Sequence, residues 1–180
     1  LKDGRTQSAR RDPFIGARSL PPPAQCRSVH IVPTEIFQRP NLGLIHPASA
    51  PNGRAAVIQG AANSSLAGTV KCVLIDAADY SYADTHDMLN DVASIARVGT
   101  PQTLANKTYL LGFFDADDVL FPAVTGDNCE AILIWIDTGV ESTSRLVAYI
   151  DSGVVGMPVL PGGSDVAIVW DSAGIFHPGL

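Results

Sequence analysis

Residues 132–139 read ILIWIDTG, and residues 147–153 read VAYIDSG. The run ILIWI is apolar at every position, whereas a strand with one solvent face would alternate apolar and polar residues. We therefore expect ILIWI to be a strand that is covered on both faces, either in the centre of a sheet or at a subunit contact. The rest of the chain must supply a packing layer for each face.

Short runs of β-branched and aromatic residues recur from residue 69 onward, each bounded by turn-forming residues. They are TVKCVLID (69–76), KTYLLGFF (107–114), VLFPAV (119–124), EAILIWID (130–137), SRLVAYID (144–151) and DVAIVWD (165–171). The expected fold class is all-β: a compact antiparallel β-sandwich or small barrel, preceded by an extended proline-rich N-terminal arm.

The connections between these runs differ in length. The six residues TGVEST (138–143) predict an antiparallel hairpin between the fourth and fifth runs. The thirteen residues that follow the fifth run predict an excursion over the sheet edge or a Greek-key crossing. Apolar residues at Met88, Leu89, Val92 and Ile95 have roughly helical spacing and favour a short helix within 83–96.

The first 54 residues have a different composition from the rest. They hold eight of the thirteen prolines, eight basic residues and three acidic ones, although the whole chain has a net charge of -6. Proline fixes φ and removes a hydrogen-bond donor, so no long helix or central strand is expected there. We expect residues 1–66 to be a basic arm with a linker, in which VHIV (29–32) docks as a short extended piece, and residues 67–180 to be the β body.

The arginines of the arm are the candidate partner-binding residues: Arg5, Arg10, Arg11, Arg18, Arg27 and Arg39. Nucleic-acid arms concentrate basic residues and use aromatic residues to stack on bases. This arm spreads its charges among apolar residues and has few aromatic side chains. Docking onto an acidic protein surface, such as that of a neighbouring subunit, is therefore favoured over direct binding of nucleic acid.

Asp-Thr-Gly and Asp-Ser-Gly after apolar strands are typical of aspartic proteases, in which two carboxylates about 3 Å apart share a proton. On the expected hairpin, Asp137 and Asp151 end opposite strands and would lie roughly 25 Å apart. Asp76 and Asp171 also close apolar runs. A shared turn chemistry at strand ends explains all four aspartates, so we expect no protease and no catalytic residue.

Acidic residues and a histidine elsewhere in the chain suggest other kinds of site. Asp115, Asp117 and Asp118 form an acidic cluster in which carboxylates at alternate positions (Asp115 and Asp117) suit Ca²⁺, but a solvated turn between two strands is the favoured interpretation. His86 has Ser81 as its only nearby candidate nucleophile, and no phosphate-binding or zinc motif is present in the sequence. We expect no cofactor and no metal.

The cysteines and the hydropathy pattern bear on two properties, the redox state of the thiols and contact with a membrane. Cys26, Cys72 and Cys129 are far apart in sequence, which suggests reduced and mostly buried thiols. No apolar run approaches the length needed to span a bilayer, so no membrane contact is expected.

Two long segments, FFDADDVLFPAVTGDNCEAILIWIDTGVESTSRLVAYIDSG (113–153) and MPVLPGGSDVAIVWDSAGIF (157–176), resemble small virion-associated structural proteins of tailed bacteriophages. The resemblance covers about residues 69–177. The loop MPVLPGGSD and the ending HPGL depart from that family's phrases, and the arm lies outside it.

The resemblance implies a non-enzymatic component of a virion that assembles in the bacterial host cytoplasm. A capsid decoration or cement protein is the favoured role, with an arm that ties neighbouring capsid subunits together. The implied partners are the major capsid protein or other virion proteins, together with further copies of the chain in a homo-oligomer. A head–tail connector, neck or tail/fibre component is the first alternative, and a Ca²⁺- or carbohydrate-binding β module is the second.

Overall fold

The computed structural model describes residues 27–31, 65–83, 85–110, 113–151 and 154–175. The strands are β1 (Arg27–Ile31), β2 (Thr69–Ile75), β3 (Arg97–Thr103), β4 (Thr108–Leu110), β5 (Phe113–Asp115), β6 (Val119–Phe121), β7 (Ala131–Asp137), β8 (Leu146–Ile150), β9 (Val154–Val155) and β10 (Val166–Val169). Three single-turn 3-10 helices accompany them in the described residues: η2 (Leu89–Asp91), η3 (Ser94–Ala96) and η4 (Glu141–Thr143). The described residues form an all-β fold, as the sequence predicts.

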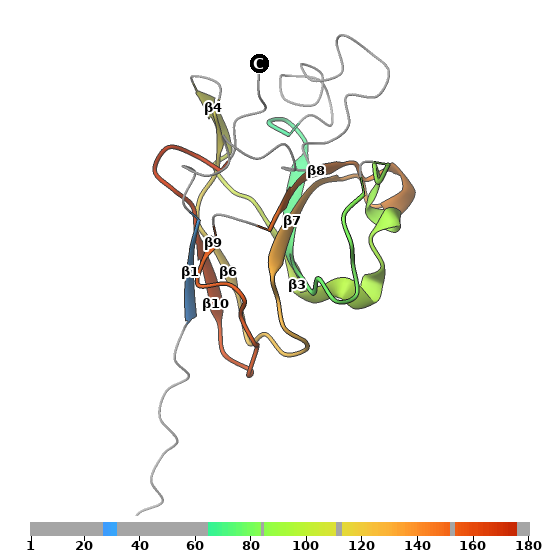
Figure 1. Cartoon of the computed structure of the whole chain (residues 1–180). Coiled ribbons are helices and arrows are strands. Elements are labelled where there is room, and N and C mark those ends of the chain that lie inside the picture. The colour runs from blue at the N-terminus through green and yellow to red at the C-terminus, as the bar shows by residue number, and fades with distance from the viewer. Residues whose placement is uncertain (1–26, 32–64, 84, 111–112, 152–153, 176–180) are drawn as a thin grey trace, which may run out of the picture.

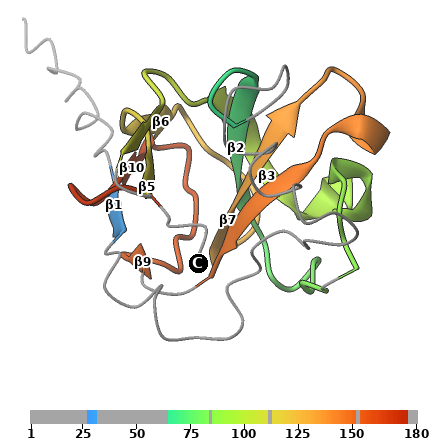
Figure 2. The ribbon, with the colours of Figure 1, turned by 90° about the horizontal axis from the view of Figure 1, so that it is seen from above.

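Two four-stranded sheets face each other. The β7 sheet has the order β3-β2-β7-β8 and is antiparallel throughout. The β1 sheet has the order β6-β10-β1-β9, in which β1 and β10 run parallel and the other pairs run antiparallel. Figures 1 and 2 show the two sheets on opposite sides of the molecule. A separate hairpin pairs β4 with β5.

Strand β7 is the centre of the packing, which confirms the prediction that ILIWI is covered on both faces. Ile132, Ile134 and Ile136 belong to the core between the sheets, where they share a cluster with Val29 and Ile168 of the β1 sheet. The other three apolar residues of the strand pack in a second cluster on the opposite face: Ala131, Leu133 and Trp135. Burial of both faces explains why no polar residue interrupts the run.

The second face of the β7 sheet is covered by the segment that contains η2 and η3 (Figure 2). The sequence predicts a short helix within 83–96, and this prediction is wrong, because the described part of that segment forms two separate 3-10 turns. The Arg97 guanidinium donates to the carbonyls of Leu89 and Val92, and the Asp91 carboxylate accepts from the N–H of Met88. Side chains thus satisfy backbone groups that an α-helix would have paired internally.

One strand prediction is wrong in detail, and one open alternative is decided. The run 107–114 contributes to two paired strands, β4 and β5, instead of one strand, with Leu110 opposite Phe113. The thirteen-residue connection contains β9 and carries the chain from the β7 sheet to the β1 sheet, so it is a crossing between sheets.

Strand β1 comes from the stretch predicted to be the arm. It confirms that VHIV contributes a docked extended piece, and Val29 is fully buried in the main core. The division of the chain at residue 66 stays a prediction, because most of the arm lies outside the described residues.

Candidate functional site

Asp137 and Asp151 lie at opposite ends of one hairpin. Ile132 is opposite Ile150 and Trp135 is opposite Leu146, so β7 ends at Asp137 where β8 begins, and Asp151 follows the far end of β8. The expectation that these two aspartates are separated by the length of a strand is confirmed. Carboxylates placed in this way within one chain do not share a proton.

Asp137 has a structural environment. Its carboxylate pairs with the Lys71 ammonium at 2.6 Å and accepts the backbone N–H of Gly139 at 3.3 Å. The hydrogen bond from Lys71, with a further contribution from the Gly139 N–H, lowers the pKa of the Asp137 carboxyl. The group is therefore held as a carboxylate, which favours an ion pair over a proton-transfer role.

The same turn chemistry recurs at other strand exits. The Asp76 carboxylate accepts from the N–H of Ala78 at 2.8 Å, and the Asp171 carboxylate accepts from the N–H of Ala173 at 2.7 Å. Each aspartate receives a hydrogen bond from the residue two positions later, as in an Asx-turn. The predicted shared role is confirmed for Asp76, Asp137 and Asp171, while the residues just after Asp151 lie outside the described ranges.

The acidic turn between β5 and β6 holds neighbouring chain segments. The Asp118 carboxylate accepts from the backbone N–H of Trp170 at 2.9 Å, and Asp117 accepts from the Asn106 side chain at 2.6 Å. Asp115 accepts from the N–H of Ala116 at 2.9 Å. These hydrogen bonds give each of the three carboxylates a structural partner, which agrees with the turn interpretation.

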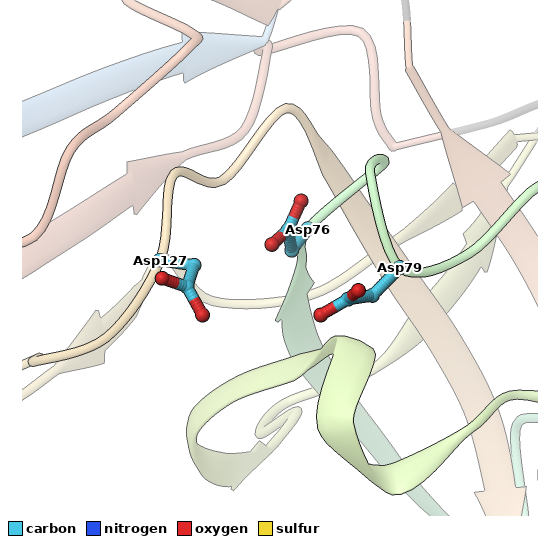
Figure 3. Close-up of side chains that lie close together, drawn as sticks. All are labelled: Asp76, Asp79 and Asp127. Carbon is cyan, nitrogen blue, oxygen red and sulfur yellow. The ribbon is translucent and has the colours of Figure 1, made fainter.

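A different set of carboxylates gathers at one end of the β7 sheet: Asp76, Asp79 and Asp127 (Figure 3). One carboxylate oxygen from each lies within 4.8 Å of the others, and Asp76 is only 6% exposed. Because β2 and β7 are antiparallel, the exit of β2 and the entry to β7 meet at the same end of the sheet. Spacing along the chain does not predict that β2 pairs with β7, so this cluster of carboxylates was not expected.

The chemistry of this acidic cluster suits a divalent cation only in part. Carboxylate oxygens are the ligands that Ca²⁺ prefers, but Ca²⁺ takes six to eight of them. Asp76 also accepts the N–H of Ala78, and the neighbouring Glu130 accepts the N–H of Ala77 at 2.9 Å. Three gathered carboxylates do not by themselves define a metal site.

His86 belongs to an aromatic group beside the β7 sheet. Its Nδ1 lies 3.0 Å from the Tyr80 hydroxyl, and Tyr80 makes an edge contact with Tyr149, on which Tyr82 stacks. Burial raises the pKa of the Tyr80 and Tyr149 hydroxyls to about 12. These contacts give the group a packing role, and Ser81 is exposed to solvent.

The candidate arginines fall mostly outside the described residues. Arg5, Arg10, Arg11, Arg18 and Arg39 lie there, so nothing in the structure brings them together. Arg27 begins β1, and its backbone is in register with Val166. The arm therefore reaches the β body through a strand pairing, a contact that the arginine pattern does not indicate.

The outer side of the β1 sheet exposes apolar residues, here named the outer apolar face: Leu120, Val155, Ala167 and Val169. Leu120 is 49% exposed between two buried neighbours on β6, and Val155 is 58% exposed on the edge strand β9. Ala167, which is in register with Leu120, and Val169 are half-buried. Leu120 and Ala167 are neighbours across β6 and β10, and exposed apolar side chains on one sheet face favour a protein–protein contact.

The described part of the chain holds no helix that is long and apolar enough to cross a bilayer. Comparison with protein-family models finds no match, and comparison with curated proteins finds none either. The functional argument therefore rests on the residues and on their arrangement.

Proposed function

We propose that the chain is a non-enzymatic structural component of a tailed-bacteriophage virion, and specifically a capsid decoration protein. The sequence resemblance over residues 69–177 supports this assignment. The aspartates that suggest an enzyme have structural partners at the strand exits, which removes the main argument for catalysis.

The outer apolar face is the structural observation that carries the proposal. Leu120 and Val155 lie on the two edge strands of the β1 sheet, so exposed apolar side chains stand at both edges of this face. A decoration protein needs an exposed apolar surface of this kind to bind the shell. Repetition over the shell lets many weak contacts act together.

The partner of this face is the major capsid protein or another virion protein, and the virion is the expected location. In this proposal the arm adds contacts to neighbouring subunits. A neck, connector or tail position would use the same surface, so the place in the particle must be measured directly.

The test compares virus particles assembled with and without this protein. Cryo-electron microscopy should locate the chain in many copies on the capsid surface, and capsids that lack it should release DNA at a lower temperature. Density only at the neck or tail, with unchanged capsid heat resistance, would favour the connector or tail alternative instead.

A surface variant tests the outer apolar face itself. Leu120→Asp combined with Val155→Asp should lower binding to capsids that lack the protein by at least tenfold, as measured by co-sedimentation, because charges replace apolar contacts. Val140→Asp is the matched control, since Val140 is 56% exposed but follows β7 in the other sheet. Equal binding by both variants would rule out this face as the docking surface.

A further inference from the structure

Strand β1 completes a sheet to which it is not locally connected. Its residues Arg27 to His30 run parallel to Val166 to Val169 of β10, and His30 and Ile31 pair with the two residues of β9. The β1 sheet therefore has a slot between β10 and β9, which a strand from the N-terminal stretch fills (Figure 1).

The body is incomplete without a strand in this slot. Val29 is fully buried and shares the main core with Ile168. If β1 left, one edge of β10 would lose its partner, and β9 would lose the strand with which it pairs. Open strand edges of this kind recruit other strands. Each copy must therefore hold a β1, from its own chain or from another.

The contacts in the slot are the same whichever chain provides the strand. The contacts that the structure describes there are backbone pairing and the burial of Val29. The connection from Ile31 to Thr69 is about 37 residues long, and a fully extended chain of that length spans at most about 120 Å. A connection of this length allows β1 to reach the slot of an adjacent copy, and exchange of an identical element between copies has a low free-energy cost.

We propose that β1 is exchanged between copies of this chain, so that the β1 of one copy lies between β10 and β9 of its neighbour. Each copy then donates one strand and accepts one, which is a head-to-tail contact that closes into a ring or continues as a chain. The exchange goes beyond the proposed function because its partner is a second copy. The exchange rests on the proposed function only in one respect: close packing of copies on a virion would raise the local concentration of neighbours.

A disulfide test distinguishes exchange from closure within one chain. Two full-length versions with different affinity tags are co-expressed at high level without phage particles, one with Ser28→Cys and the other with Ala167→Cys. Both carry Cys26→Ser. Ser28 and Ala167 are in register, and neighbouring strands are about 4.8 Å apart, which a disulfide can span. Cys72 and Cys129 do not interfere, because both are fully buried and burial raises the pKa of each thiol to about 12.

We expect a covalent heterodimer after mild oxidation, purification through both tags and non-reducing electrophoresis. The control replaces Ala167→Cys with Thr100→Cys, an exposed position on β3 of the other sheet, and should give at most a tenth as much heterodimer. A third version carries Ser28→Cys and Ala167→Cys in one chain and reports closure within that chain.

Two results would overturn the proposal. One is a complete intrachain disulfide in the double variant, with no more heterodimer than the Thr100→Cys control. The other is no disulfide in either arrangement, which would mean that β1 does not lie beside β10. Because no particles are present, failure of exchange leaves the capsid-binding test of the proposed function unaffected.

Discussion

The aspartates at the strand exits show how one residue type suggests an active site and yet serves the fold. Asp137 lies at the end of a buried strand, where a carboxylate meets water and can also receive a backbone hydrogen bond. Its ammonium partner, Lys71, extends from the adjacent strand β2. A short motif alone does not distinguish this structural role from catalysis, since both use an ionised carboxylate after a strand.

The Asp137–Lys71 pair should stabilise the fold modestly and in a pH-dependent way. Asp137→Asn keeps the oxygen that accepts from Gly139 but removes the charge. We expect a coupling free energy of about 0.5 kcal/mol at pH 7 in a double-mutant cycle with Lys71→Met, because exposed ion pairs contribute little. Urea unfolding monitored by tryptophan fluorescence measures it.

The pH dependence follows from the direction of the shift. The pKa of Asp137 is lowered in the fold, so its contribution is complete above the usual value of 3.8 and is lost as the pH falls through the lower folded value. The coupling should therefore approach zero in acid. A coupling that stays constant between pH 7 and the acid limit would show that charge is not its source.

At the scale of elements, composition predicted strands well and a helix badly. The runs that became β2, β6, β7, β8 and β10 are short and rich in β-branched residues, and burial on the sheets agrees with that local preference. The segment before β3 has apolar residues at helical spacing, yet Ile95 is 69% exposed. Its conformation depends on hydrogen bonds from the Arg97 side chain and on a backbone bridge to the chain beside β8. The local spacing of apolar residues does not predict either contact.

The double burial of β7 makes a prediction about its two faces. Leu133→Ala and Ile134→Ala should each lower the free energy of unfolding by about 2–5 kcal/mol, because each removes a buried side chain from a different packed cluster. Urea unfolding gives both values.

The control for this pair is Leu120→Ala on the exposed side of β6, which should change the free energy of unfolding by less than about 0.5 kcal/mol. If only one of the two β7 variants is destabilised, the other face of the strand must be accessible to solvent.

At the scale of the whole molecule, the features that matter most join residues far apart in sequence. The slot for β1 and the acidic cluster both depend on which strands become neighbours. Local patterns identify strands but do not say how they are ordered in a sheet, so neither feature could be predicted. The outer apolar face is of the same kind, because it needs β6, β10 and β9 in one sheet.

The dependence of the β1 sheet on Val29 can be measured. Val29→Asp should expel β1, because an unpaired carboxylate would enter the core. Hydrogen exchange should then show lost protection at Val154–Val155 and at part of Val166–Val169, while β2 and β7 stay protected.

Val140→Asp, which adds the same charge at an exposed site, should leave all of these amides unchanged. Unchanged exchange on β9 and β10 in Val29→Asp would mean that the sheet does not need β1, and that residues 67–180 form a complete body.

The parallel pairing of β1 with β10 also affects how the protein is made. During translation the ribosome releases β1 first, whereas its partner strand emerges about 140 residues later. At typical rates of synthesis that delay is roughly 7–28 s. The first strand must wait unpaired while the β7 sheet forms, and the prolines on both sides of it in the sequence disfavour pairing with the wrong chain in the meantime. If copies exchange β1 as proposed, this delay is the interval in which the β1 of one copy can meet the completed sheet of another.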